Sequence, residues 1–275
     1  MLAVTLVLVA LALIYTRGWI RLRRTLPAAI PASKLAAFLA GLTAVWIALA
    51  SPLSSLDDEL LLAHMIQHLL LMTIAAPLIL AGAPAVTLLH GLPQSFVRIV
   101  LGPPLRSTAL QWLGKNLTHP AVCWLAGTGV VMLWHVPKLF ELGMRSEPWH
   151  HVEHATFFAA GLLFWWPIIQ PWPSVARWPR WSLPLYLFLA TLPCDALSAF
   201  LTFCDRVIYP SYFAAPRMLG LTALDDQQWA GTLMWVWVTF VYMAPAVAVT
   251  VGILSPGSAN QSARGSGISR TSGNW

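Results

Sequence analysis

Histidine residues gather in two short segments of this chain, each near the start of a long apolar stretch. His64 and His68 are four residues apart, and His150, His151 and His154 form the second group. Residues four apart share one face of a helix, so His64 with His68, and His150 with His154, are predicted to present their rings together. Because imidazole nitrogens bind copper, zinc and iron, this pattern indicates a transition-metal site.

The composition places these histidines in a membrane. The chain has 275 residues, of which 58% are hydrophobic and only 9% are charged, whereas soluble domains are about 25% charged. Apolar windows of about 20 residues can cross a bilayer as helices. We therefore expect an all-α polytopic membrane protein, a bundle of about seven transmembrane helices forming a single domain over residues 1–254, with a flexible polar tail at 255–275. The expected spans lie near residues 2–16, 35–51, 60–80, 118–136, 150–169, 183–203 and 229–254.

The distribution of basic residues predicts the orientation of the bundle. The loops and tail on one side of the expected spans hold 12 Lys and Arg residues, whereas those on the other side hold 4. Basic residues mark the cytoplasmic side, so we expect the N-terminus outside and the C-terminus in the cytoplasm. The net charge of +6 is then explained by orientation in the bilayer, and nucleic-acid binding is not expected.

With this orientation, six of the eight histidines map to the outer face. His135 closes the fourth expected span on that side, whereas His90 and His119 fall on the cytoplasmic side. Intramembrane ionisable groups are costly to bury and are functional candidates. The candidate metal ligands are His64, His68, His135, His151 and His154. Possible partners or additional ligands are His150, Glu153, Asp195, Asp226 and Met65.

Three of these residues, Asp195, Asp226 and Met65, have a simpler alternative. Glu153 or Asp226 could fix the tautomer of a metal-bound histidine, but Asp226 could equally be part of the acidic first turn of the last helix. Asp195 lies near the middle of the sixth expected span, two residues after Pro193, where it could be a ligand, a proton acceptor or a buried hydrogen-bonding group. Met65 could add a thioether ligand for cuprous ion or simply fill the core.

Four segments resemble the seven-helix CtaG family of bacterial cytochrome c oxidase assembly factors, and the likeness extends over about residues 40–252. The resemblance implies a role in maturing the haem-copper oxidase by supplying copper to it. It carries onto the motif positions His64, His68, His135, His151, His154 and Asp226. The segments are His-Met-Ile-Gln-His-Leu-Leu-Leu-Met at 64–72, Trp-His-Val-Pro-Lys-Leu-Phe at 134–140, His-Val-Glu-His-Ala-Thr-Phe-Phe-Ala-Ala-Gly-Leu-Leu-Phe-Trp-Trp-Pro at 151–167 and Asp-Gln-Gln-Trp-Ala-Gly at 226–231.

Together, the residues and the resemblance predict a non-enzymatic assembly factor in the bacterial plasma membrane. It is expected to bind copper, in the cuprous state, through the outer histidines and to deliver it to a cytochrome c oxidase subunit. Three alternatives remain open. A haem-binding redox protein could use His68 and His154 as axial ligands, a histidine-zinc hydrolase would need a carboxylate such as Glu153 or Asp226 beside a polarised water, and an assembly scaffold would hold no metal.

Overall fold

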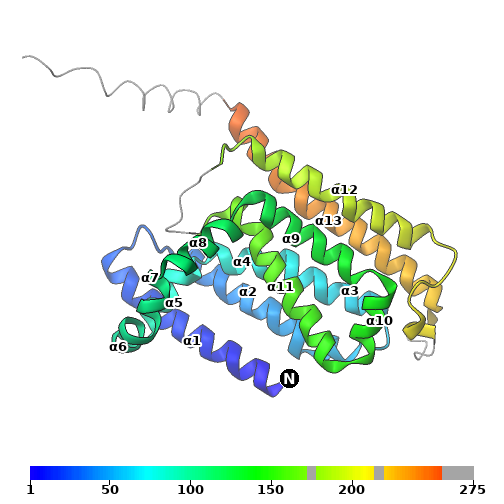
Figure 1. Cartoon of the computed structure of the whole chain (residues 1–275), viewed down its shortest axis with the longest axis horizontal. Helices are drawn as coiled ribbons and strands as arrows, with labels where there is room; N and C mark the ends of the chain where they lie inside the picture. Colours follow the sequence, from blue (N-terminus) through cyan, green and yellow to red (C-terminus); the bar gives the residue numbers. More distant parts are fainter. Residues whose placement is uncertain (172–177, 214–219, 256–275) are drawn as a thin grey trace, which may run out of the picture.

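A computed structural model describes residues 1–171, 178–213 and 220–255, and these residues form an all-helical bundle without strands (Figure 1). The predicted tail falls almost entirely outside the described residues. The long helices are α1 (Leu2–Thr25), α2 (Ala32–Ala50), α9 (Pro120–Trp134), α11 (Glu147–Ile169), α12 (Ser182–Phe203) and α13 (Ala223–Leu254). The shorter elements are η1 (Pro52–Ser55), α3 (Leu61–Leu69), η2 (Leu70–Ala75), α4 (Ala76–Ala81), α5 (Pro84–Gly91), α6 (Gln94–Phe96), η3 (Val97–Leu101), α7 (Gly102–Arg106), α8 (Thr108–Leu117), α10 (Pro137–Arg145) and η4 (Pro210–Phe213).

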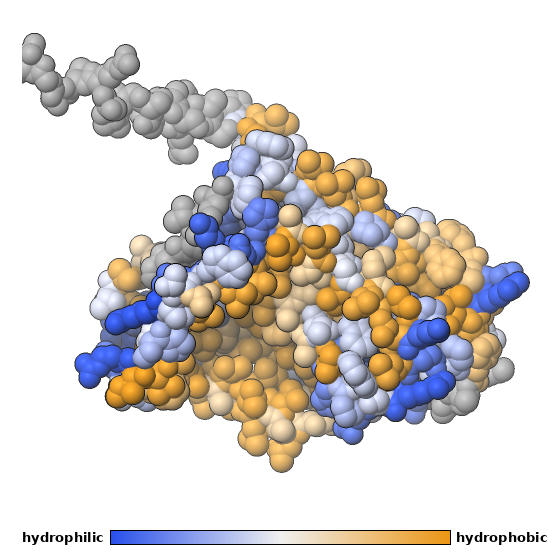
Figure 2. Space-filling model, in the orientation of Figure 1, coloured by the Kyte–Doolittle hydropathy of each residue, from blue (hydrophilic) through white to orange (hydrophobic). Residues whose placement is uncertain are grey.

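The described residues contain six helical segments that are long and apolar enough to cross a membrane. Two further helix pairs meet that test only together, α5 with α6–α7 and α8 with α9, and they are bent by 119° and 67°. Apolar residues cover much of the visible side of the bundle, and hydrophilic residues gather toward its two ends (Figure 2). The chain is therefore a membrane protein, as its composition predicts, with six to eight candidate spans.

Two of the predicted spans differ from the observed helices. The first was expected at residues 2–16, but α1 continues to Thr25 and is 24 residues long. The fourth was expected at 118–136, but α9 has only 15 residues and is preceded by α8 at a sharp bend. Hydropathy locates apolar segments but does not show where His119 and Pro120 interrupt the helical hydrogen bonding.

The span Leu61–Ala81, formed by α3, η2 and α4, is the centre of the bundle. Its most apolar window is 61% buried, whereas that of α1 is 11% buried. Helices α2, α11 and α13 pack around it. Figure 1 shows α12 and α13 side by side along one edge of the bundle and α1 along the opposite edge. Side chains carried by α3 are consequently shielded from lipid on several sides.

A π-helix, η2, begins at Leu70, two residues after His68, within this central span. Trp165 of α11 donates its indole N–H to the Met72 carbonyl at 3.0 Å, and Trp237 of α13 donates to Thr73 Oγ1 at 2.8 Å. Gly161 of α11 lies against the same turn, where a Cβ would come within 3.0 Å of Met72 Cα. Such π-helical turns are frequent at functional sites, and here two indoles and a glycine fix the turn beside the histidines.

Aromatic residues cover the end of the bundle at which α3 begins. Phe140 of α10 packs against Tyr209, with ring centroids 4.0 Å apart. The Tyr212 hydroxyl donates to the Asp57 carbonyl at 2.7 Å, and the Tyr209 hydroxyl donates to the His135 carbonyl at 3.2 Å. These contacts tie the loop at 204–213 to the loop at 51–60, to the end of α9 and to α10.

Candidate metal centre

Helix α3 brings His64 and His68 into the interior of the bundle. Their rings lie on one face with centroids 4.3 Å apart, as the spacing of four residues predicts. The two side chains are almost entirely buried, with 0% and 5% exposure. Phe157 stacks on His68 at 4.0 Å and Phe140 contacts the edge of His64. The imidazoles are thus held in fixed positions away from lipid.

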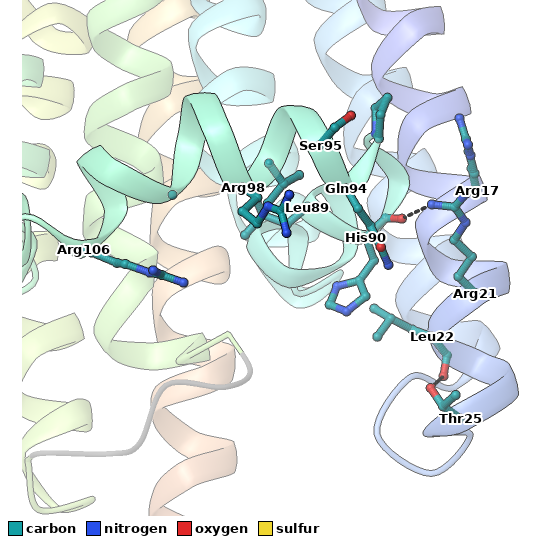
Figure 3. A pocket seen from close by; sticks show the side chains of 13 residues that line it. Arg17, Arg21, Leu22, Thr25, Leu89, His90, Gln94, Ser95, Arg98 and Arg106 are labelled. Atoms are coloured by element: carbon teal, nitrogen blue, oxygen red, sulfur yellow. Dashed lines mark hydrogen bonds between the residues drawn. The ribbon is translucent and has the colours of Figure 1, made fainter.

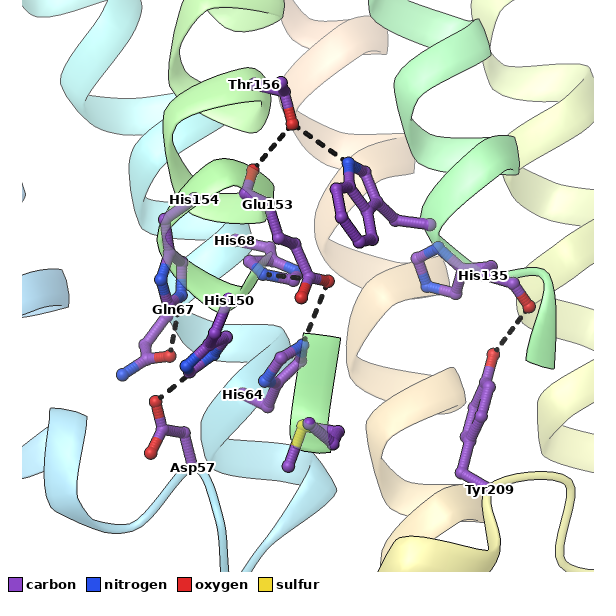
Figure 4. A network of polar contacts seen from close by, with 12 residues as sticks. Asp57, His64, Gln67, His68, His135, His150, Glu153, His154, Thr156 and Tyr209 are labelled. Carbon is purple, nitrogen blue, oxygen red and sulfur yellow. Dashed lines mark hydrogen bonds and ion pairs between the residues drawn. The ribbon is translucent and has the colours of Figure 1, made fainter. Parts of the chain in front are cut away.

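Helix α11 faces α3 with a carboxylate. The Oε1 atom of Glu153 lies 3.4 Å from His64 Nε2 and 3.6 Å from His68 Nε2 (Figure 4). Glu153 is 1% exposed. Gly143 of α10 allows this approach, because a Cβ there would lie 2.7 Å from Glu153 Oε2. One ligand atom from each of His64, His68 and Glu153 lies within 4.8 Å of the other two. We call these three residues the inner group.

The inner group has polar atoms that the described protein does not satisfy. Within residues 1–171, 178–213 and 220–255, His64 Nδ1, both ring nitrogens of His68 and Glu153 Oε2 are buried and accept or donate no hydrogen bond. An unpaired buried polar atom costs about 1 to 3 kcal/mol. Two imidazoles and a carboxylate that converge in this way fit a transition-metal ion, whose coordination would offset that cost.

A second set of ligands lies next to the inner group. His150 and His154 of α11 have ring centroids 4.4 Å apart, and His150 Nε2 lies 3.6 Å from Asp57 Oδ2. One ligand atom from each of Asp57, His150 and His154 lies within 4.8 Å of the other two. We call these residues the outer group. Its rings touch those of the inner group, since His150 stacks parallel to His64 at 5.5 Å.

The outer group opens to a groove of about 600 Å³. Its lining includes Met1, Asp58, Met144 and the three outer-group residues. Burial raises the pKa of the Asp57 carboxyl, and the positive charge that His150 can carry opposes this shift. The groove thus leads from the end of the bundle to the outer group. The outer group lies between the groove and the inner group.

Three of the candidate residues lie outside both groups. His151 is exposed on the wall of the groove, and its Nδ1 bonds to the Glu147 carbonyl at 2.7 Å. His135 is buried, with Nδ1 bonded to the Val131 carbonyl at 2.7 Å. Its Nε2 is unpaired among the described residues. His135 and Met65 line a cavity of about 30 Å³ beside His68.

Asp195 and Asp226 also lie outside the two groups. Asp195 is partly exposed and accepts a hydrogen bond from Thr239 at 3.3 Å across the contact between α12 and α13. Asp226 accepts the backbone N–H groups of Leu61 and Leu62 at 2.7 and 3.0 Å. Asp226 therefore caps α3 from a distant helix, and its carboxylate also suits the positive end of the α3 dipole.

This cap predicts a loss of stability on substitution. Asp226→Ala leaves two N–H groups of α3 without their acceptor, and we expect the free energy of unfolding to fall by about 1 to 2 kcal/mol. Asp226→Asn should cost less, because the amide oxygen can still accept one N–H. Thermal unfolding of the purified protein in detergent, followed by circular dichroism, measures the change. Asp205→Ala is the control, since Asp205 is exposed, and equal effects of both alanine variants would contradict the capping role.

Sequence reasoning missed two contributors to the site. Asp57 belongs to the acidic run Asp57-Asp58-Glu59, which falls on the same predicted side as the histidines but has no spacing typical of a metal ligand. Gln67 lies three residues after His64, which places it on a neighbouring part of the same helix face. Its Oε1 lies 3.2 Å from His154 Nε2, so that it links α3 to the outer group.

Comparison with known proteins gives the family of the chain. A family model described as cytochrome c oxidase caa3 assembly factor (Caa3_CtaG) matches residues 13–255. An uncharacterized protein of Mycobacterium leprae is 24% identical over 234 residues, which are 82% of this chain and 35% of the relative. An uncharacterized protein of Mycobacterium bovis is 25% identical over 237 residues, with the same coverage. The chain thus spans about a third of the length of these relatives, and no solved structure matches it. By the extent of the family match, the chain belongs to the Caa3_CtaG family of cytochrome c oxidase assembly factors.

Proposed function

We propose that this assembly factor binds copper in the inner group and supplies it to a haem-copper cytochrome c oxidase. The observation that carries the proposal is the convergence of His64, His68 and Glu153, where four buried polar atoms form no hydrogen bond within the described protein. Copper is the cargo in this proposal. The family supports the choice of a cytochrome c oxidase as the recipient. The geometry supports metal binding, because the three candidate ligands are buried side by side.

The outer group gives this cargo a route to the inner group. An ion that arrives through the groove meets Asp57 and His150 before it meets His64, whose ring is stacked on His150 at 5.5 Å. Adjacent sets of ligands allow an ion to move by exchange of one ligand at a time, without passing through an apolar region. For delivery, the ion would follow this path in reverse. It would leave the inner group, pass the outer group and the groove, and reach an oxidase subunit docked at the same end of the bundle.

The proposal includes an orientation in the bacterial plasma membrane. We place the groove on the outer side, because the loops predicted on the opposite side hold most of the Lys and Arg residues. Eight of the ten Asp and Glu residues lie in the loops predicted on the groove side, Glu153 is the fourth residue of the span that follows one of these loops, and Asp195 lies near the middle of a span. This charge asymmetry favours an N-terminus outside and a C-terminus inside.

The alternative functions have less support from the site. A haem would need a cavity of several hundred Å³ between its axial ligands, whereas the cavity beside His68 is about 30 Å³ and the ring of His68 directly contacts that of His154. Two imidazoles and a carboxylate also suit zinc. Copper is favoured over zinc because the family assembles a haem-copper oxidase. A scaffold that holds no metal would leave the buried polar atoms of the inner group without hydrogen bonds or a ligand to offset their burial.

A deletion experiment tests the proposed function in cells. Removing this protein from its host is expected to abolish most cytochrome c oxidase activity in the membrane, and excess copper in the medium should restore part of it. Complementation with His64→Leu/His68→Leu should fail at normal copper levels, whereas complementation with the wild type should succeed. Oxygen consumption with reduced cytochrome c measures the activity. A deletion strain that excess copper does not rescue at all would support a scaffold and contradict copper supply.

A further inference from the structure

A large basic pocket lies at the other end of the bundle from the histidines. Its volume is about 980 Å³, and it is formed between the last turns of α1 and the helices α5 to α7 (Figure 3). Met1, at the start of α1, lines the groove beside the outer group, whereas Arg17 lines the basic pocket. Sixteen helical residues separate them, a distance of about 24 Å along the axis. The two sites are therefore physically distinct.

Four arginines give the pocket its charge. Arg17 and Arg21 project from α1, Arg98 from η3 and Arg106 from the end of α7. In Figure 3, Arg98 lies between Arg21 on one side and Arg106 on the other. Arg21 donates to the His90 carbonyl at 3.0 Å, which holds it at the pocket wall. The guanidinium groups thus surround one concavity rather than being spread over separate surfaces.

No Asp or Glu side chain compensates this charge. All ten acidic residues of the chain are described, none of them lines the pocket, and none forms an ion pair with any of the four arginines. The sequence has no Asp or Glu in residues 1–56 or 60–140. Four like charges around one concavity repel each other, so the pocket favours an anion. Arginine pairs with phosphate oxygens through two parallel hydrogen bonds.

The walls of the pocket are held by close backbone contacts. A Cβ at Gly18 of α1 would lie 1.9 Å from the Thr87 carbonyl oxygen of α5, and a Cβ at Gly91 would lie 1.9 Å from the Ile14 carbonyl oxygen. The two glycines therefore allow α1 and α5 to cross in direct contact. This crossing fixes the positions of Arg17 and Arg21 relative to the rest of the pocket.

Apolar side chains next to the arginines point to a lipid as the ligand. The segment that carries Arg98 also exposes Phe96, Ile99 and Val100, at 43%, 67% and 51%. An interfacial helix has this mixture of basic and apolar faces. We propose that the basic pocket binds the headgroup of an anionic phospholipid, with its phosphate between the α1 arginines and Arg98 and Arg106, and its acyl chains along the exposed apolar residues.

Lipid binding to the purified full-length protein tests this proposal. Native mass spectrometry in detergent would compare phosphatidylglycerol with phosphatidylcholine, which carries no net charge, each added at increasing concentration. We expect wild-type protein to retain phosphatidylglycerol preferentially. The double variant Arg98→Gln/Arg106→Gln should bind it about 30-fold more weakly, because it removes two of the guanidinium groups that would pair directly with the phosphate.

A matched control distinguishes a pocket from general attraction. Arg23→Gln/Lys115→Gln removes the same charge from residues that do not line the pocket. It should leave phosphatidylglycerol binding within about twofold of wild type, because exposed charges at a distance are screened by salt. Equal losses in both double variants, or no loss in either, would overturn the proposal. Inorganic phosphate at millimolar concentration serves as a competitor. Complete displacement of the lipid by it would show a site for soluble anions and would also overturn the lipid assignment.

Discussion

Replacing His64 and His68 together with leucine is expected to weaken cuprous-ion binding by a factor of about 100 or more. The variant leaves Glu153 as the remaining member of the inner group, and a carboxylate oxygen is a poor ligand for Cu(I). Competition with a chromogenic cuprous chelator, using protein purified in detergent, measures the affinity. Leucine is preferred to alanine because it fills most of the space that the two rings occupy.

The same variant should still fold, although we expect it to be less stable than the wild type. His64 Nε2 and His68 Nε2 lie 3.4 and 3.6 Å from Glu153 Oε1, so the substitution leaves this buried carboxylate without its imidazole partners. The free energy of unfolding of the metal-free protein is therefore expected to fall by about 1 to 3 kcal/mol. Thermal unfolding without metal tests this point. His90→Ala/His119→Ala, which alters two exposed histidines elsewhere, is the control for copper affinity. Undiminished copper binding by a folded leucine variant would exclude the inner group as the site.

Glu153→Gln is expected to weaken copper binding by about 10 to 100-fold without unfolding the protein. The substitution keeps the size of the side chain and an oxygen that can face both histidines, but it removes the negative charge that lies 3.4 Å from His64 and 3.6 Å from His68. A buried cation loses the charge that balances it. The cuprous-chelator competition assay again measures the affinity.

Glu147→Gln is the matched control for this charge change. Glu147 lies on the same helix but is exposed, and only its backbone carbonyl bonds to His151. We expect copper affinity to stay within about twofold of wild type, because an exposed charge is screened by solvent. If Glu147→Gln and Glu153→Gln weakened binding equally, the effect would arise from the overall charge of this end and not from the inner group.

The helix pattern of the sequence explains much of the fold and part of the site. A spacing of four residues predicted that His64 and His68 share a face, and their rings are in contact. Hydropathy predicted an all-helical membrane protein, which the apolar helices confirm. The motif resemblance predicted the family, which the match over residues 13–255 confirms. These features depend on local periodicity or on short motifs, so that they can be recognised in a single chain.

The contacts between distant segments could not be predicted in the same way. Asp226 was a candidate partner of a metal ligand, but it caps α3 across 165 residues of sequence. Asp57 belongs to the outer group because a loop folds back onto α11, and Glu153 faces α3 because Gly143 leaves room for it. Periodicity describes the face on which a residue lies but not the element that packs against that face.

X-ray absorption at the copper edge of wild-type protein, loaded with one equivalent of cuprous ion, tests the central claim most directly. The inner group predicts nitrogen and oxygen scatterers at short distance with the outer-shell pattern of at least two imidazoles, and it predicts that the pattern is lost in His64→Leu/His68→Leu. A folded wild-type protein that retains no copper, or copper surrounded only by sulfur, would contradict the account.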